Sequence, residues 1–290
     1  MRLADRGGRG VFRGVFRGGA VAVITAVMSI AAAAESVTLS YRFQVGDRID
    51  MDVAHRALTE TTVNGTTQTV ETMTDSRKTW RVVAVDEGGR ATLEHSVDDV
   101  VMTSRSSDSG EVRWASGSTD DPPPGYEGVR QSLGVPLSRM VIDATGHVLD
   151  RREIRPCPAS ATGDLVVVPL PDGPIAAGAE WTVPQEVVVE APGAGRKAVR
   201  TRLRYRLEGV RDGVATIDVD TTVLTPVDDP RLEARLLERI WRGTITFDVE
   251  AGRVVSRRTG IDRRVVGFSG PQSSVRYKSS LEERSIDPQP

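Results

Sequence analysis

Residues 80–96 read WRVVAVDEGGRATLEHS, and residues 205–220 repeat the pattern as YRLEGVRDGVATIDVD. In both stretches a Gly-containing turn separates two runs in which apolar and polar side chains alternate. This alternation is typical of an antiparallel hairpin with one face on a core and the other face in water.

Folding each stretch at its turn predicts the strand register. A turn at 211–213 predicts the pairs Leu203–Thr221, Tyr205–Val219 and Leu207–Ile217 on the apolar face, with Arg204–Asp220 and Arg206–Asp218 on the polar face. A turn at 86–89 predicts Val82–Leu93 and Trp80–His95 on the apolar face, with Arg81–Glu94 on the polar face. Because register, facing and a charge pair agree, the sequence predicts a repeated β-hairpin.

Two further landmarks recur in the same order. VGDRIDMDV at 45–53 corresponds to AGAEWTVPQEV at 177–187, and DATGHVLDRR at 143–152 corresponds to VEAGRVVSRR at 249–258. In the first copy, Asn64-Gly65 is a strong two-residue turn signal and predicts a long hairpin with arms at about 50–63 and 66–79.

Each copy is also expected to hold one helix. In the second copy, Asp229 is a capping residue, Pro230 suits the first turn and Gly243 follows the expected end. The apolar residues at helical spacing there are Leu232, Leu236, Leu237 and Ile240. In the first copy a shorter helix is expected over residues 126–133.

These patterns predict a mainly β protein with minor α content. The expected architecture is two tandem repeats of curved antiparallel sheet, each with one short helix packed on a face, half-barrel-like in form. The first β-rich repeat is placed at residues 35–170 and the second at 171–290.

The N-terminal residues 1–34 are expected to be a secretory signal peptide. Five arginines precede an apolar run at 20–34, and small residues end the run before Glu35. Cleavage near Ala34 would export the protein to the periplasm or the cell surface. The remaining residues 35–290 carry 33 basic and 39 acidic side chains, and this acidic balance argues against nucleic-acid binding. No apolar run in these residues is long enough to cross a bilayer.

Catalytic and metal-binding patterns are missing from the sequence. The three histidines, His55, His95 and His147, are not spaced as zinc ligands, and Cys157 has no second cysteine with which to form a disulfide. Nucleophile elbows and phosphate-binding glycine loops are also missing. We therefore expect no catalytic residues, no metal, no cofactor and no enzyme activity; a loop calcium at Asp120-Asp121 and a hydrolase are the minor alternatives.

Two sets of residues are candidates for binding. The candidates for lining a ligand groove are Trp80, His95, Trp181, Tyr205, Leu236 and Trp241. The candidates for contacting an anionic partner are Arg200, Arg202, Arg204 and Arg206, which alternate with less polar residues along one strand. An ordinary solvated charge ladder, neutralised by Asp218 and Asp220, is the simpler interpretation of the arginine row.

Three blocks of the chain resemble an uncharacterised exported-protein family that is common in planctomycete bacteria. The blocks are GVPLS at 134–138, LTPVDDP at 224–230 and RRVVGFSG at 263–270. The resemblance covers residues 40–282 and implies export and a fold rich in β-strand, but it implies no activity and no catalytic residues.

The leading functional hypothesis is a non-enzymatic envelope or periplasmic protein that shelters a hydrophobic or lipid ligand in a groove of its curved sheets. The alternative is a structural or protein-interaction module of the cell envelope, which would bind another envelope protein by strand addition. Oligomeric state discriminates between them, because a liganded monomer favours carriage and a concentration-dependent assembly favours a scaffold.

Overall fold

A computed structural model describes residues 36–122, 127–155 and 167–286. The predicted signal peptide, Tyr126 and Cys157 lie outside these ranges. The described elements of the first half are β1 (Ser36–Thr38), β2 (Arg48–Val63), β3 (Thr66–Val85), β4 (Ala91–Ser106), β5 (Gly110–Ala115), α1 (Val129–Ser132), β6 (Ser138–Ile142) and β7 (Val148–Glu153). Those of the second half are β8 (Pro174–Ala176), β9 (Glu180–Ala191), β10 (Gly195–Arg211), β11 (Val214–Val223), α3 (Pro230–Leu236), the 3-10 helix η1 (Leu237–Arg239), β12 (Arg242–Asp248), β13 (Arg253–Val266) and β14 (Ser273–Ile286).

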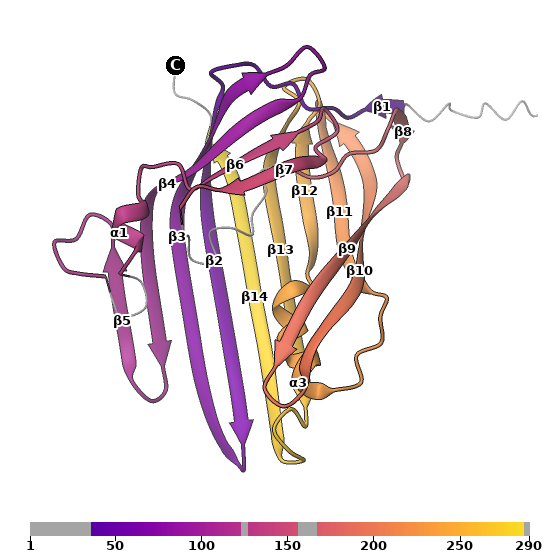
Figure 1. Cartoon of the computed structure of the whole chain (residues 1–290). Coiled ribbons are helices and arrows are strands. Elements are labelled where there is room, and N and C mark those ends of the chain that lie inside the picture. The colour runs from indigo at the N-terminus through magenta and orange to yellow at the C-terminus, as the bar shows by residue number, and fades with distance from the viewer. Residues whose placement is uncertain (1–35, 123–126, 156–166, 287–290) are drawn as a thin grey trace, which may run out of the picture. The chain divides into compact units, whose positions relative to one another are not determined.

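One large antiparallel sheet contains most of the described strands of both halves, which confirms the mainly β prediction with minor α content. Its strand order is β7-β6-β4-β3-β2-β14-β13-β12-β11-β10-β9, with β5 paired to β4. The halves join edge to edge where β14 pairs with β2 from Ser273↔Val63 to Ile286↔Asp50, and Figure 1 shows the yellow β14 beside the purple β2. Strands β1 and β8 form a separate two-stranded sheet.

Both repeated hairpins adopt the predicted register. Tyr205 pairs with Val219 and Leu207 with Ile217, while Trp80 pairs with His95. The long hairpin turns at Asn64 and Gly65, whose φ angles of 50° and 80° fit the two-residue turn that this dipeptide favours.

Charge pairing on the polar face differs in part from the expectation. Arg204 forms the predicted ion pair with Asp220, at 3.1 Å. Glu94, however, pairs with Arg139 of the neighbouring strand β6, and Arg206 forms an ion pair with Glu208 of its own strand at 3.4 Å. Long arginine side chains reach along and across strands, so a position directly opposite a carboxylate does not decide the partner.

The second predicted helix is confirmed, although it is shorter than expected. Asp229 caps α3 by accepting from the backbone N–H of Arg231 at 2.9 Å, and Pro230 occupies the first turn. Gly243 does not follow the helix but lies within β12, where a Cβ atom would clash with the carbonyl oxygen of Arg258. In the first half, α1 is only four residues long, with Val129 buried.

The sheet is strongly curved, because Tyr41 contacts two parts of it that are far apart in the strand order. Its backbone N–H donates to the carbonyl of Ala144, in the turn between β6 and β7, at 2.8 Å. Its ring packs edge-on against Phe247 of β12, with centroids 5.4 Å apart. Strands β6 and β12 are six places apart in the strand order, roughly 29 Å in a flat sheet. The sheet therefore curls around segment 39–43.

Two glycine turns enclose this segment, one from each half. A Cβ atom at Gly146 would lie 2.5 Å from Cε2 of Tyr41, and one at Gly252 would lie 2.8 Å from the backbone nitrogen of Arg42. The backbone N–H of Arg42 also donates to the carbonyl of Gly252 at 3.2 Å. These are the two turns that correspond in the repeated sequence, so the equivalent parts of both halves meet the same segment.

The two faces of the sheet differ in chemistry. We call the face that carries Trp80, Tyr205 and Ile217 the inner face, because its apolar side chains form the main core. The opposite, outer face carries Arg204, Asp218 and other charged residues. Smaller clusters pack beneath each helix, with Leu232 and Leu236 of α3 in one and Val129 of α1 in the other.

Candidate functional site

A hollow of about 1070 Å³ lies between α3 and the inner face of the sheet. Its floor is formed by the adjacent strands β2 and β14, which contribute Thr59, Thr61 and Val275. Thr61 and Val275 lie directly opposite each other on these two strands. The turn at 267–270 and one side of α3 form its walls. We call this cavity the helix hollow.

Helix α3 has one side on the core and another side in the helix hollow. Leu232 and Leu236 pack in one cluster with Val189 and Val199 of β9 and β10. Arg231, Ala234 and Arg235 line the hollow and recur at the spacing of one helical face. Packing of the leucine side therefore fixes which residues reach the cavity.

The lining of the helix hollow is chemically mixed. Pro192, Ala234, Phe268 and Val275 supply apolar surface, whereas the floor threonines supply hydroxyl groups. Charged groups lie at the α3 side, where Arg231 forms a 2.7 Å ion pair with Asp229. Such a lining suits a molecule that has both an apolar part and a polar part.

The capping carboxylate makes α3, and with it the hollow, sensitive to acid. Hydrogen bonds from the Arg231 side chain and then from its backbone N–H lower the pKa of Asp229 from 3.8 to about 2. Because the folded-state pKa is the lower one, the ionised carboxylate stabilises the cap above about pH 3.8, and this contribution is lost as the pH falls through about 2.

We expect the backbone amides of residues 231–233 to lose protection against hydrogen exchange as the pH falls from 4 to 2. In Asp229→Asn, whose amide caps without titrating, protection should not change over that range. The same acid-induced loss in both proteins would contradict a role for the Asp229 carboxylate.

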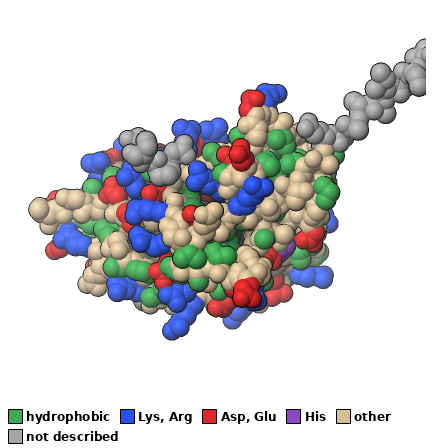
Figure 2. All heavy atoms as spheres, turned by 90° about the horizontal axis from the view of Figure 1, so that it is seen from above, with side chains coloured by type: hydrophobic (Ala, Val, Ile, Leu, Met, Phe, Trp, Pro, Cys, Tyr) green, Lys and Arg blue, Asp and Glu red, His purple; other side chains and the backbone are tan. Residues whose placement is uncertain are grey.

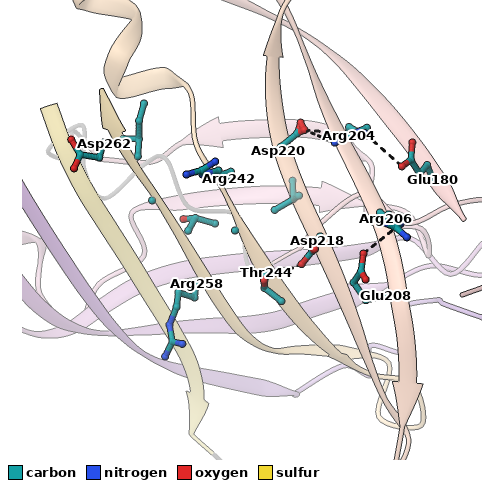
Figure 3. A pocket seen from close by; sticks show the side chains of 15 residues that line it. Glu180, Arg204, Arg206, Glu208, Asp218, Asp220, Arg242, Thr244, Arg258 and Asp262 are labelled. Atoms are coloured by element: carbon teal, nitrogen blue, oxygen red, sulfur yellow. Dashed lines mark hydrogen bonds and ion pairs between the residues drawn. The ribbon is translucent and has the colours of Figure 1, made fainter. Parts of the chain in front are cut away.

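A second hollow, of about 650 Å³, lies on the outer face over β10 to β13 (Figure 3). We call it the outer trough. Arg242 lies opposite Asp220 on one side and opposite Gly260 on the other, and Gly260 leaves a position without a side chain. The ion pairs made by charged residues of the trough are Arg204–Asp220, Arg204–Glu180, Arg206–Glu208, Arg258–Glu282 and Asp262–Arg276.

The predicted groove residues lie in packed clusters and line neither of these two hollows. Trp80 and Tyr205 are each 2% exposed in the main core, and burial raises the pKa of Tyr205 to about 12. Trp80 stacks on His95 with ring centroids 4.5 Å apart, and Trp181 stacks on Tyr205 with ring centroids 5.4 Å apart.

The other two groove candidates lie apart from these stacked pairs. Trp241 packs on the edge of the main core, whereas Leu236 belongs to the separate cluster beneath α3. Ligand contact by the six residues stays a prediction. Among the residues that line the helix hollow, the sequence signals were the cap at Asp229 and Pro230 and the helical spacing of α3, which indicate a helix and not a cavity.

The predicted arginine row lies on the outer face. Arg204 and Arg206 line the outer trough, whereas Arg200 and Arg202 lie outside it and are exposed. Arg204 is neutralised by two carboxylates. Seen from above, basic and acidic side chains are interspersed over the molecule (Figure 2). A role of the row in binding an anionic partner stays a prediction.

No group of three or more potential metal ligands occurs among residues 36–122, 127–155 and 167–286. His55 contacts Ser279 at 3.3 Å, and His147 lies beside Asp143. None of the helices described is long and apolar enough to cross a membrane.

No protein-family model and no curated protein matches the sequence. Among solved structures, the one titled "Lipid-protein interactions in lipovitellin" matches with a TM-score of 0.45 and 13% identity, over 84% of this chain and 25% of that chain. This chain thus spans about a quarter of its length.

A second match is DynF from the dynemicin biosynthesis pathway of Micromonospora chersina. It has a TM-score of 0.23 and 8% identity, over 89% of this chain and 88% of that chain. At these scores neither likeness carries a functional argument.

Proposed function

We propose that the protein is a non-enzymatic, exported carrier that shelters a lipid-like amphiphile in the helix hollow. The observation that carries the proposal is the hollow of about 1070 Å³ between α3 and the curved sheet. Its volume is slightly above the range of about 300–1,000 Å³ that small-molecule sites typically occupy. Export rests on the N-terminal sequence, with its basic segment and apolar run.

The lining supports an amphiphile over a wholly apolar or wholly ionic ligand. An alkyl segment would cover Ala234, Phe268 and Val275. The polar end would lie towards the charged side of α3, where Arg235 has no ion pair among the contacts of the described residues. A fully apolar ligand would instead leave the floor threonines and these charges without water or a partner.

An interaction module of the envelope is the second candidate. Edge strand β7 favours it, because Val148 and Leu149 are 38% and 52% exposed on a strand with one open edge, and Ile154 just beyond it is 43% exposed. An open edge with apolar side chains is suited to the addition of a strand from another protein.

Native mass spectrometry of residues 35–290, purified from the envelope of the native host, tests the carrier proposal. We expect a discrete added mass that disappears on denaturation and whose fragments identify an amphiphile. Ala234→Trp fills the hollow from the side of α3 that faces away from the core, so the added mass should be lost or strongly reduced.

Val45→Trp is the matched control, because it adds the same side chain at a position that is 65% exposed and outside the hollow. This variant should keep the added mass. A bare mass for the wild-type chain, or equal occupancy in Ala234→Trp and wild type, would overturn the carrier proposal. Cross-linking to a partner in that case would support the interaction module.

A further inference from the structure

The outer trough has an unusual charge balance. Nine charged side chains line it, and seven of these form the ion pairs given above. Within the part of the chain that the structure describes, the two that have no ion pair are Arg242 and Asp218. They are of opposite sign, and both are exposed to solvent.

The cross-strand neighbours of these two groups have other partners or no side chain. Arg242 is opposite Asp220, but that carboxylate accepts from Arg204 at 3.1 Å, and the other neighbour of Arg242 is Gly260. Asp218 is opposite Arg206, whose ion pair is with Glu208.

Arg242 and Asp218 are diagonal neighbours across β11 and β12. Diagonal positions are about 7–8 Å apart, and no ion pair joins the two side chains among the described contacts. Gly260, the other cross-strand neighbour of Arg242, also lines the trough and has no side chain to pair with the guanidinium. Figure 3 shows Arg242 and Asp218 among the residues that line the trough. Thr244 donates a hydrogen bond to Asp218 at 3.1 Å and thereby orients its carboxylate.

We propose that the outer trough binds a zwitterion that carries one ammonium group and one phosphate or carboxylate group. The guanidinium of Arg242 holds the anionic group through paired hydrogen bonds, and Asp218 accepts from the ammonium. An ion of one sign neutralises only one of the two groups, so a zwitterion binds more tightly than either half. This site is on the face opposite the helix hollow and does not depend on the carrier function.

Isothermal titration with O-phosphoethanolamine, inorganic phosphate and ethanolamine tests the site. We expect O-phosphoethanolamine to bind at least about tenfold more tightly than either of the other two probes, the difference that one charge-assisted hydrogen bond typically makes. Arg242→Gln and Asp218→Asn should each weaken its binding about tenfold.

Matched controls are available on the same outer face. Arg284→Gln and Glu190→Gln each remove one exposed strand charge that lies outside the trough and has no ion pair among the described contacts. Both variants should bind O-phosphoethanolamine like the wild type. Equal affinities for the zwitterion and its halves, or equal losses in trough and control variants, would overturn the proposal.

Sedimentation with lipid vesicles distinguishes a lipid headgroup from a soluble molecule as the source of the zwitterion. If it is a lipid headgroup, sedimentation with phosphatidylethanolamine vesicles will exceed that with phosphatidylglycerol vesicles, and Arg242→Gln will abolish the difference. If it is a soluble molecule, free O-phosphoethanolamine binds and neither type of vesicle does. Either result supports the site, provided that both trough variants lose binding.

Discussion

Replacing Gly146 by alanine is expected to lower the free energy of unfolding by about 4 kcal/mol. Two effects add at this position. The φ angle of +81° costs an alanine about 1 kcal/mol, and its Cβ atom would lie 2.5 Å from both the Tyr41 ring and the carbonyl oxygen of Val168. Neither neighbour can move away easily, because Tyr41 is 6% exposed and its hydroxyl bonds to both the N–H and the carbonyl of Val168.

Gly213→Ala separates the two effects. Gly213 has a similar φ angle of +77°, but no atom lies within 4 Å of a Cβ at this position. The control should therefore lose only about 1 kcal/mol. Urea unfolding of the two variants measures the difference. Equal losses would mean that segment 39–43 is not tightly held between the two halves of the sheet.

Arg257→Met is expected to destabilise the protein by about 3–5 kcal/mol, because it leaves the carboxylate of Glu283 buried without this partner. The two residues are directly opposite each other on β13 and β14, with Nε and Oε2 3.4 Å apart and side chains only 9% and 7% exposed. Burial penalises an ion strongly when its counter-ion is removed.

The adjacent pair supplies the control for this second prediction. Arg258 and Glu282 lie on the same two strands, 3.0 Å apart, but face outward with exposures of 71% and 53%. Arg258→Met should cost less than about 1 kcal/mol, as exposed ion pairs do. The double variant Arg257→Met/Glu283→Leu should recover most of the stability lost in Arg257→Met. Similar losses for Arg257→Met and Arg258→Met would contradict the argument from burial.

The hairpin registers could be read from sequence because they depend on local patterns. The alternation around Tyr205 and Trp80, with a short turn between each pair of strands, leaves one register that places all large apolar residues on one face. The cap at Asp229 and the apolar spacing of α3 were equally local, and the structure confirms both.

The candidate sites were less accessible to sequence reading. The aromatic residues Trp80, Trp181 and Tyr205 were chosen for an apolar groove, yet they pack together in the core of the curved sheet. The hollows lie elsewhere, one between α3 and the strands that carry Thr61 and Val275, and one on the outer face beside Arg242. Neither arrangement has a sequence pattern, because the residues meet from distant strands.

The sequence by itself determined the two repeated hairpins, their local register, the face that each of them buries and the start of α3. Only the tertiary structure decided that β14 pairs with β2, that the sheet curls around segment 39–43, and which partners Glu94 and Arg206 take. The physical reason is the distance along the chain over which each kind of contact forms. A two-residue side-chain period and a turn fix the contacts between neighbouring strands, whereas the curvature, the ion pairs across strands and the hollows depend on the packing of the whole sheet at once.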